Sequence, residues 1–404
     1  MRNVRILLGI AFIILGAIFF APQIKDFITG VAPIVRPAPA LPPGGEPLPF
    51  SLPEGFAAYL YADDLPGVRV LARGPGAPMY ASLTSEGRVV ALLDEDGDGK
   101  IDRIEAVLEG LRRPHGLVFG CIDIEQTVCT LYVAEEHQVS AYDFAPATRI
   151  ASSPKKLAAL PSGGGHNTRT LMLHPDSKRL LVSIGSSCNV CNEEDERRAA
   201  ILAIDLATGE TETFATGLRN TVFLTTHYVT GDIWGTDMGR DHLGDDLPPD
   251  EINIIKEGGN HGWPICYGKN VHDTVFDKNT YIRNPCMEPF ETPSHIDLQA
   301  HSAPLGLAFI PEEGWPEEWW YDLLVAYHGS WNRSVPTGYK IVRFPLDAHG
   351  NPEGPAVDFM TGFMTDSGAV VGRPVDIIAE PGGTLYISDD RAGAIYRIVR
   401  TSLD

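Results

Sequence analysis

The chain has 404 residues, with 32 basic and 53 acidic side chains and a formal net charge of −21 at pH 7. This charge repels nucleic acids and anionic lipid surfaces and excludes both as principal partners. At roughly 100–200 residues per domain, the length accommodates two or three small domains or one large all-β domain.

The chain begins with an apolar stretch. Arg2 and Arg5 precede an uncharged, mostly apolar run from Ile6 to Ile24, close to the ~20 residues with which a helix crosses a bilayer. The basic residues before the run favour a cytoplasmic N-terminus and an exported body. We therefore predict a single transmembrane anchor over residues 1–30, in a bacterial inner membrane, with the remaining chain in the periplasm. A signal peptide cleaved on export is the alternative.

Residues 31–49, VAPIVRPAPALPPGGEPLP, are rich in proline and predict an extended linker. Beyond it, six cysteines form three sequence-close couples, as is typical of disulfides made outside the cytoplasm. A metal site is the alternative, but Cys188 and Cys191 have no second CxxC pair to complete a zinc site. The couples are Cys121 with Cys129, Cys188 with Cys191, and Cys266 with Cys286.

From residue 50 to the C-terminus, short β-branched runs alternate with Gly, Pro, Asn and Asp, which predicts an all-β domain over 50–404. A pattern of short strands returns six times, and repeats of four short strands over roughly 40–50 residues indicate a six-bladed β-propeller. A large β-sandwich is the alternative. The fourth repeat carries a long insertion from about Asp241 to Pro293, and residues 56–62 are expected to close the ring beside the last blade. The repeats cover 68–93, 115–144, 168–206, 220–255, 304–344 and 374–399.

An acidic segment directly after the first repeat, DEDGDGKIDRIE, has the oxygen-ligand spacing of an EF-hand calcium loop. An EF-hand needs a helix on each side, whereas strand-type sequences flank this segment. We therefore predict a structural calcium turn between two strands of the first blade, with a solvated acidic hairpin as the alternative. The candidate ligands are Asp94, Asp96, Asp98, Asp102 and Glu105.

Two short motifs carry candidate functional side chains. His166 follows three glycines in GGGHNTRT, where the backbone can approach a ligand closely and the imidazole can project from the start of a strand. A solvated loop histidine is the alternative. Arg219 and Asn220, in GLRNT, place a planar cation beside an amide, and this pair suits a carboxylate or a quinone oxygen.

Two further regions are polar where a packed strand would be apolar. Residues 235–264 are acidic and glycine-rich, and their carboxylates and carbonyls predict a calcium environment. His328 and Arg333 in AYHGSWNR, and Arg373 in GRPVDI, are predicted at corresponding inner-strand positions of the later blades, where they would line the central channel.

The order of these motifs resembles the glucose/sorbosone dehydrogenase family, the soluble aldose sugar dehydrogenases that depend on pyrroloquinoline quinone (PQQ). The resemblance implies a six-bladed propeller that holds PQQ and Ca²⁺ at the top of its channel. It covers nearly everything from residue 50 onward. The segments that carry it are 166–185, 217–221, 250–264, 302–310, 323–333 and 372–390.

The resemblance assigns roles to the candidate residues. It implies that His166 is the general base that removes the substrate hydroxyl proton while a hydride moves to the quinone. Arg219 and Asn220 would contact the ortho-quinone side of PQQ, and Arg373 would contact a carboxylate of the cofactor. His328 or Arg333 would replace a lysine that better-known members carry in the later blade.

The resemblance also implies the calcium ligands. The backbone carbonyls of Gly239 and Arg240 would bind the catalytic Ca²⁺, and Asp250 and Glu251 would support this metal site from beside it. Together these assignments predict PQQ- and calcium-dependent oxidation of an aldose or a related, sorbosone-like hydroxy-aldehyde. Electrons would pass to a separate quinone or cytochrome, because the chain has no haem motif. A calcium-dependent lactonase or esterase and a non-catalytic propeller that binds a glycan or a protein are the alternatives.

Overall fold

The computed structural model describes residues 46–123 and 125–401. The predicted anchor and most of the proline-rich linker lie outside the described residues. Within them, no helix has the length and apolar character needed to cross a bilayer. Their single helical element is one 3₁₀ turn, η1 (Glu317–Trp319), and strands make up the other regular structure.

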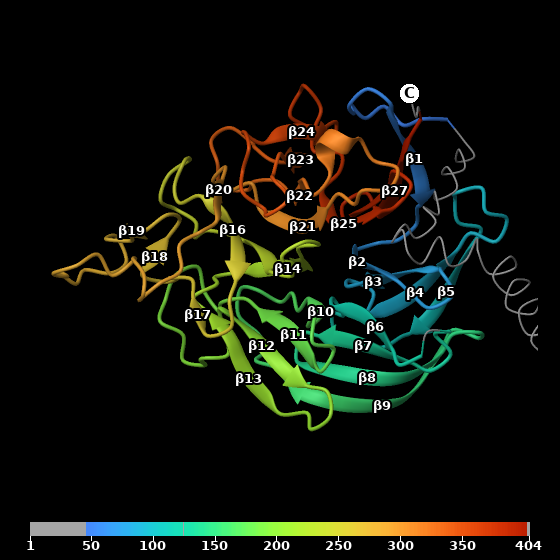
Figure 1. Cartoon of the computed structure of the whole chain (residues 1–404), viewed down its shortest axis with the longest axis horizontal. Coiled ribbons are helices and arrows are strands. Elements are labelled where there is room, and N and C mark those ends of the chain that lie inside the picture. Colours follow the sequence, from blue (N-terminus) through green and yellow to red (C-terminus); the bar gives the residue numbers. More distant parts are fainter. Residues whose placement is uncertain (1–45, 124, 402–404) are drawn as a thin grey trace, which may run out of the picture. The chain divides into compact units, whose positions relative to one another are not determined.

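Six antiparallel sheets surround a central axis, as Figure 1 shows, so the predicted six-bladed β-propeller is confirmed. Each blade has four strands, numbered here from the axis outward. Blade 1 contains β2 (Val68–Arg73), β3 (Met79–Leu83), β4 (Arg88–Leu93) and β5 (Arg103–Leu108); blade 2 contains β6 (Leu117–Cys121), β7 (Cys129–Glu135), β8 (Gln138–Ala145) and β9 (Ile150–Ala159); blade 3 contains β10 (Leu171–Leu173), β11 (Arg179–Ile184), β12 (Ala200–Asp205) and β13 (Thr211–Thr216).

The later blades follow the same plan. Blade 4 contains β14 (Thr221–Thr226), β15 (Ile233–Asp237), β16 (Asp250–Ile255) and β20 (Ile296–Leu298); blade 5 contains β21 (Pro304–Phe309), β22 (Leu323–Tyr327), β23 (Lys340–Phe344) and β24 (Val357–Met360); blade 6 contains β25 (Pro374–Glu380), β26 (Thr384–Asp389), β27 (Ala394–Arg400) and β1 (Phe56–Ala62). In blade 6, β1 pairs antiparallel with β27, with Phe56 opposite Arg400. The predicted ring closure by residues 56–62 is therefore confirmed.

The second strand of each blade is almost fully buried because neighbouring blades cover both of its faces. All five residues of β3, β15 and β22 are buried, although these strands carry small and polar side chains as well as large apolar ones. The largest fully buried side chain is Trp234 in β15. Burying a large apolar side chain contributes about 1.5–3 kcal/mol, so packing between blades stabilises the ring.

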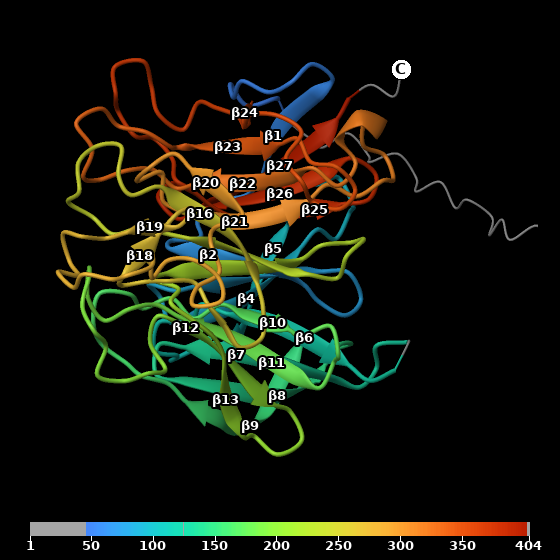
Figure 2. The same cartoon turned by 60° about the vertical axis from the view of Figure 1, so that its left-hand side comes forward.

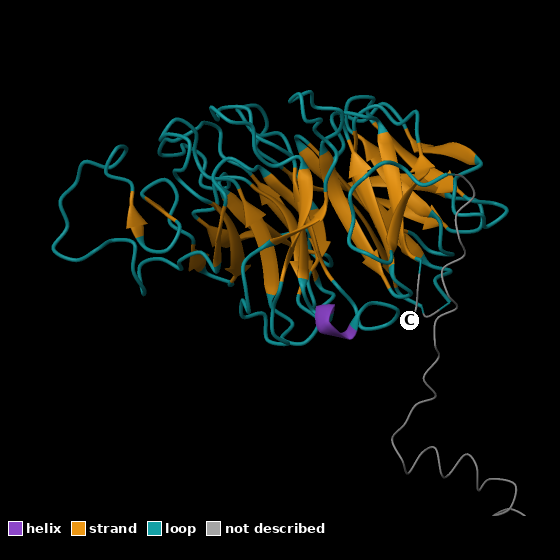
Figure 3. Cartoon of the chain, turned by 90° about the horizontal axis from the view of Figure 1, so that it is seen from above, coloured by secondary structure: helices purple, strands orange, loops and turns teal. Residues whose placement is uncertain are grey.

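The inner strands β2, β6, β10, β14, β21 and β25 contact one another around the axis and form the wall of the channel. Residues from all six line a hollow of about 250 Å³. Figure 3 shows the strands as the middle layer of the disc, with connecting loops on both of its faces.

Two excursions interrupt blade 4, where we predict one insertion over 241–293. The strand β16 lies within that range, so residues 238–249 form a first loop and residues 256–295 a second, longer one. The second loop contains β17 (Gly259–Asn260), β18 (Cys266–Tyr267) and β19 (Val271–His272), and Figures 1 and 2 show it at the rim of the ring beside β16. The strand β17 also pairs in parallel with β13 of blade 3.

All three predicted disulfides are present. Cys121–Cys129 joins the ends of β6 and β7, Cys188–Cys191 closes a short loop after β11, and Cys266–Cys286 braces the second excursion of blade 4. No cysteine is free. The acidic segment connects β4 to β5, which confirms its predicted place in a strand hairpin.

Candidate active site

Four of the predicted residues gather at one end of the channel. His166 lies in the loop before β10, Arg219 and Asn220 directly precede β14, and Arg373 directly precedes β25. These strands are the inner strands of blades 3, 4 and 6, and every inner strand begins at the same face of the disc. The repeated topology therefore brings together residues more than 200 positions apart.

His166 is held in one tautomer by the loop that follows β11. Its Nδ1 lies 2.9 Å from the carbonyl oxygen of Ser186 and 3.1 Å from the Ser186 hydroxyl. Because a carbonyl can only accept, Nδ1 donates and carries the proton, which leaves Nε2 as the acceptor nitrogen. Burial, with a contribution from the Arg219 charge, lowers the pKa of His166 to about 4. The ring is therefore neutral at neutral pH and able to receive a proton.

The backbone before β14 is positioned by Asp237, the last residue of β15. Its carboxylate accepts the amide of Arg219 at 3.1 Å, the amide of Asn220 at 2.8 Å and the Thr221 hydroxyl at 2.9 Å. Burial raises the pKa of Asp237 to about 6. The guanidinium of Arg219 donates to the Met238 carbonyl at 3.2 Å, so its orientation is fixed as well.

Gly185, directly after β11, lets His166 and Asn220 approach each other. A Cβ atom at this position would lie 2.4 Å from Oδ1 of Asn220 and 2.6 Å from Cβ of His166. Only glycine leaves room for both side chains. The Oδ1 atom of Asn220 is buried and has no hydrogen-bond partner among the described residues. Such an orphaned acceptor is costly unless a ligand satisfies it.

Asp250 fixes the loop that carries Gly239 and Arg240, the predicted ligands of the catalytic Ca²⁺; we call residues 238–249 the calcium loop. One carboxylate oxygen accepts the Gly239 amide at 2.9 Å, while the other accepts the Ala303 amide at 2.9 Å and the Ser302 hydroxyl at 3.2 Å. Burial raises the pKa of Asp250 to about 6. The carboxylate thus joins blade 4 to the start of β21, and it positions the Gly239–Arg240 backbone through hydrogen bonds.

Glu251 acts on the neighbouring excursion. Its carboxylate accepts the Gly268 amide at 2.6 Å and the Asn253 side-chain amide at 3.0 Å. Burial, reinforced by the negative charge of Asp237, raises the pKa of Glu251 to about 8. Asp250 therefore fixes the Gly239–Arg240 backbone and Glu251 fixes the second excursion beside it, while the Gly239 and Arg240 carbonyls remain the candidate metal ligands.

Arg373 is fixed by the chain that follows β22. Its Nε donates to the His328 carbonyl at 3.1 Å, its Nη2 donates to the Gly329 carbonyl at 2.8 Å, and its amide donates to Asp389 at 2.9 Å. The His328 ring lies 3.0 Å from the Asp390 carboxylate. Arg373 and His328 are therefore adjacent, and Nη1 of Arg373 donates to no acceptor within the described residues.

The predicted inner-strand position of His328 and Arg333 is wrong. Both follow β22, the second strand of blade 5, whereas β21 is its inner strand. Arg333 donates to the carbonyl oxygens of Asp245 and Ala300 and pairs with the Asp246 carboxylate at 2.7 Å. Its guanidinium joins two rim loops and is not brought together with Arg373. The motif AYHGSWNR alone does not distinguish an inner strand from a second strand, because polar loops follow strands of both kinds.

The structure adds contacts that the motifs alone do not predict. Asp241 accepts from the side-chain amide of Asn332 at 2.9 Å and lies 3.4 Å from Nη2 of Arg219. Asn189 accepts from Nη2 of Arg219 at 3.0 Å through its side-chain oxygen. Asp241 lies within the acidic stretch 235–264. The composition of that stretch predicts a functional region but does not single out Asp241.

An exposed aromatic residue stands at the rim of the site. Trp331 lies between Gly329 and Asn332, is 70% exposed and packs edge to face against His242 with ring centroids 5.6 Å apart. Its neighbours in the chain are tied to Arg373 and Asp241. A large exposed aromatic ring in such a constrained position suits contact with a ligand.

The acidic hairpin brings together three of its five predicted ligands. Carboxylate oxygens of Asp94, Asp96 and Asp102 lie within 4.8 Å of one another. Asp94 also accepts the Gly99 amide at 3.0 Å, and Asp102 accepts the Glu95 amide at 2.7 Å. The remaining oxygen of Asp94 is buried and has no partner in the described part of the chain, which suits a cation.

The other two predicted ligands lie elsewhere. Asp98 accepts the amide of Lys100 at 2.8 Å and is not part of the carboxylate group. Glu105 pairs with Arg103 and, at 2.6 Å, with Arg149 of the next blade. These two guanidinium groups lower the pKa of Glu105. Glu105 therefore forms an ion pair between blades.

The fold and the site together define a class of protein: a six-bladed propeller with a neutral histidine, an orphaned amide oxygen and two fixed arginines around one end of its channel. More specifically, the chain belongs to the TrAA12-like family, whose family model matches residues 50–401. This membership confirms the predicted relationship to the PQQ-dependent sugar dehydrogenases.

Three individual similarities accompany the family match. An uncharacterized protein of Borreliella burgdorferi is 38% identical over 244 residues, which are 60% of this chain and 63% of that protein. A pyrroloquinoline quinone-dependent pyranose dehydrogenase of Coprinopsis cinerea is 23% identical over 373 residues, covering 76% of this chain and 49% of the other. This chain thus spans about half the length of the Coprinopsis enzyme. A Trichoderma reesei structure of carbohydrate-active enzyme family AA12 shares the fold, with a TM-score of 0.73 at 21% identity over 92% of this chain and 99% of its own.

Proposed function

We propose that this protein is a PQQ- and calcium-dependent dehydrogenase that oxidises an aldose or a related hydroxy-aldehyde of the sorbosone type. The observation that carries the proposal is the buried, unpartnered Oδ1 of Asn220 beside His166 and Arg219. A proton acceptor, a fixed cation and an unsatisfied amide in one place suit a polar cofactor and a hydroxyl substrate. The named activity of the Coprinopsis relative supports the same assignment.

The residues present fit PQQ, which carries three carboxylates. In a chain with a net charge of −21, a polyanionic cofactor needs fixed cations, and Arg219 and Arg373 supply them. Carbonyl oxygens hold one edge of the Arg373 guanidinium. In Arg219, Nε, Nη1 and Nη2 each donate to a protein oxygen. Both cations are therefore fixed in orientation before a ligand binds. Arg373 retains Nη1 for a cofactor carboxylate. The unpaired Oδ1 of Asn220 is an acceptor, so it suits the substrate hydroxyl, which donates, and not a quinone oxygen, which only accepts.

The carbonyl oxygens of Gly239 and Arg240 would hold Ca²⁺, which prefers oxygen ligands. The Gly239–Asp250 hydrogen bond keeps this backbone in place. When bound, PQQ would supply an ortho-quinone that takes up a hydride, and Ca²⁺ would polarise a quinone oxygen.

His166 performs the proton chemistry. Its Nε2 takes the proton of the substrate hydroxyl as the neighbouring C–H bond breaks. The hydrogen bond from Nδ1 to the Ser186 carbonyl keeps Nε2 unprotonated beforehand and stabilises the imidazolium that forms. Trp331, exposed at the rim, offers an aromatic ring for contact with the sugar.

We also propose that residues 1–30 anchor the enzyme in a bacterial inner membrane and that the propeller faces the periplasm. Three disulfides and the absence of free cysteines support an oxidising compartment. Electrons would leave through a separate quinone or cytochrome. An anchored enzyme would lie close to membrane quinone.

The test is reconstitution of the purified full chain with PQQ, with and without Ca²⁺. We expect saturable binding that changes the absorbance of PQQ, and dye reduction by aldoses that requires both additions. Failure to bind PQQ in excess Ca²⁺ would overturn the proposal. Hydrolysis of a lactone without PQQ would instead indicate a propeller hydrolase.

A further inference from the structure

The loop from Gly185 to Cys191 contacts His166 of blade 3 and both Arg219 and Asp241 of blade 4. The Ser186 carbonyl accepts from His166, and the Ser186 amide donates to the Arg219 carbonyl at 2.8 Å. The Ser187 carbonyl accepts the amide of Gly165 at 2.8 Å, directly before His166. The loop therefore positions the proposed base from both sides.

Asn189, at the tip of this loop, links the cofactor arginine to the calcium loop. Its backbone carbonyl accepts from Nε of Arg219 at 2.9 Å, and its side-chain oxygen accepts from Nη2 at 3.0 Å. The same side-chain oxygen accepts the Asp241 amide at 2.8 Å, and the side-chain nitrogen donates to the Asp241 carbonyl at 3.2 Å. One asparagine therefore makes four hydrogen bonds to two elements of the site.

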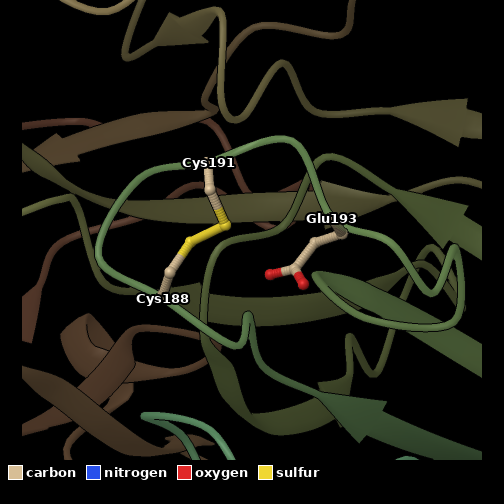
Figure 4. Close-up of side chains that lie close together, drawn as sticks. All are labelled: Cys188, Cys191 and Glu193. Atoms are coloured by element: carbon tan, nitrogen blue, oxygen red, sulfur yellow. A yellow bond between two sulfur atoms is a disulfide. The ribbon is translucent and has the colours of Figure 1, made fainter.

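The disulfide Cys188–Cys191 closes the turn that presents Asn189. Figure 4 shows this bond spanning the turn with the Glu193 carboxylate beside it. Glu193 accepts from the Ser187 amide at 2.6 Å and from the Ser187 hydroxyl at 2.7 Å, and the Ser186 hydroxyl donates to the Cys188 carbonyl at 2.6 Å. Disulfide and carboxylate together restrict a loop that has no strand pairing of its own.

We propose that Asn189 is a positioning residue of the cofactor site and that the Cys188–Cys191 disulfide holds it in place. Asn189 orients the guanidinium of Arg219 and ties it to the Asp241 backbone, so the cofactor cation and the calcium loop keep a fixed separation. This inference rests on the proposed function, because it assigns Arg219 and the calcium loop to PQQ and Ca²⁺. The CxxC sequence serves here as a structural constraint on a binding site.

The first test compares Asn189→Ala with Asn192→Ala. Asn192 is exposed directly after this loop, and its side chain takes part in no hydrogen bond within residues 46–123 and 125–401. Loss of a hydrogen bond to a charged group predicts that Asn189→Ala weakens PQQ binding by about 10- to 100-fold, while Asn192→Ala binds like the unmodified chain. Both variants should melt within a few degrees of it. A purely structural role would lower the melting temperature without changing affinity, and this result would overturn the proposal.

A second measurement does not depend on the cofactor. In cofactor-free protein, amide hydrogen exchange at Asp241 should accelerate in Asn189→Ala but not in Asn192→Ala, because Asn189 accepts this amide. Accelerated exchange in a chain that never binds PQQ would support the positioning role and refute the proposed function. Unchanged exchange together with unchanged PQQ affinity would refute the positioning role and leave the proposed function intact.

The role of the disulfide has its own matched pair of variants. Replacing Cys188 and Cys191 with serine should weaken PQQ binding about 10-fold, whereas replacing Cys121 and Cys129, which brace a hairpin of blade 2, should leave it unchanged. Equal affinities in the two folded double variants would overturn the part assigned to Cys188–Cys191.

Discussion

The acidic hairpin between β4 and β5 and the entrance of the channel are both candidate calcium sites, but they are assembled differently. In the hairpin, three carboxylates within nine consecutive residues converge at the surface. At the channel entrance, buried carboxylates such as Asp237 and Asp250 bind backbone amides, and blades 3, 4 and 6 each supply a different group. A local set of side chains suits a cation that holds one hairpin, whereas a distributed and buried set suits chemistry on a bound molecule.

The environments explain this division of labour. Solvent-exposed carboxylates are free to coordinate a cation. A buried carboxylate stays ionised only where hydrogen bonds replace the water that it has lost. Burial raises the pKa values of Asp237 and Asp250 to about 6, and their bonded amides then shape the loops that carry Gly239, Arg219 and Asn220. We therefore expect substitutions at the entrance to change binding and turnover, and substitutions in the hairpin to change stability.

The largest expected effect is at His166. His166→Ala should lower turnover by about 10²–10⁴-fold, because the proposed general base is lost, while PQQ binding measured by absorbance stays close to normal. The hairpin variant Asp94→Asn with Asp96→Asn is the control and should keep its turnover. Full activity of His166→Ala would place the base elsewhere.

A smaller loss is expected at Arg373. Arg373→Gln removes a fixed cation and should weaken PQQ binding by about 10- to 100-fold, the range for a charge-assisted hydrogen bond. Arg391→Gln is the matched control, since Arg391 lies in the same blade and donates to the Val370 carbonyl at an exposed position. Equal affinities of the two variants would separate Arg373 from the cofactor site.

Glu291, a buried carboxylate outside both regions, should make the stability of the fold depend on pH. Burial raises the pKa of Glu291 to about 8, and neither of its oxygens has a partner in the described residues. The pKa of Glu291 in the folded protein lies above its unfolded value of about 4.3. Its contribution to stability is therefore fully present below about pH 4.3 and is lost as the pH rises through about 8. The melting temperature should therefore fall by several degrees between pH 5 and about 9.

Glu291→Gln should flatten this pH dependence, whereas Glu54→Gln, at an exposed position, should preserve it. Calorimetry at several pH values is the measurement. Parallel pH profiles for Glu291→Gln and the unmodified chain would show that Glu291 is ionised in the folded protein at neutral pH.

The smallest expected effect belongs to the hairpin. Replacing Asp94 and Asp96 with asparagine should lower the melting temperature in Ca²⁺ by a few degrees, because an ion that binds only the folded state stabilises it. Activity at moderate temperature should stay close to normal. Loss of PQQ binding with an unchanged melting temperature would instead assign the hairpin to the active site. The hairpin would then not be a purely structural calcium site.

Several features could be predicted from sequence because their determinants are local or repeated. Strand-length apolar runs separated by turn residues predict six blades, and the close spacing of Cys121 and Cys129 predicts their bond. The motifs around His166, Arg219 and Arg373 predict candidate site residues, and the structure brings these three to one end of the channel. In each case the signal lies within a few residues of the feature itself.

Other features depend on contacts between distant segments. The link from Asn189 to Arg219 and Asp241 spans 30 and 52 positions, and the ion pair of Glu105 with Arg149 crosses from blade 1 to blade 2. The expected calcium role of Glu105 follows from its loop spacing, but two neighbouring guanidinium groups compete for its carboxylate. Local spacing cannot predict that competition.

The sequence by itself determined the strand periodicity, the six repeats and the residue types available at the start of each inner strand. The tertiary structure alone decided which of these residues meet, because ring closure through β1 and β27 sets the positions of all six blades at once. It also decided how deeply each carboxylate is buried: Asp250 and Asp94 are the same residue type, yet Asp250 is almost fully buried and accepts the amides of Gly239 and Ala303, whereas Asp94 is partly buried and accepts the Gly99 amide of its own hairpin. Burial and hydrogen bonding depend on packing between blades, and packing is a property of the closed ring.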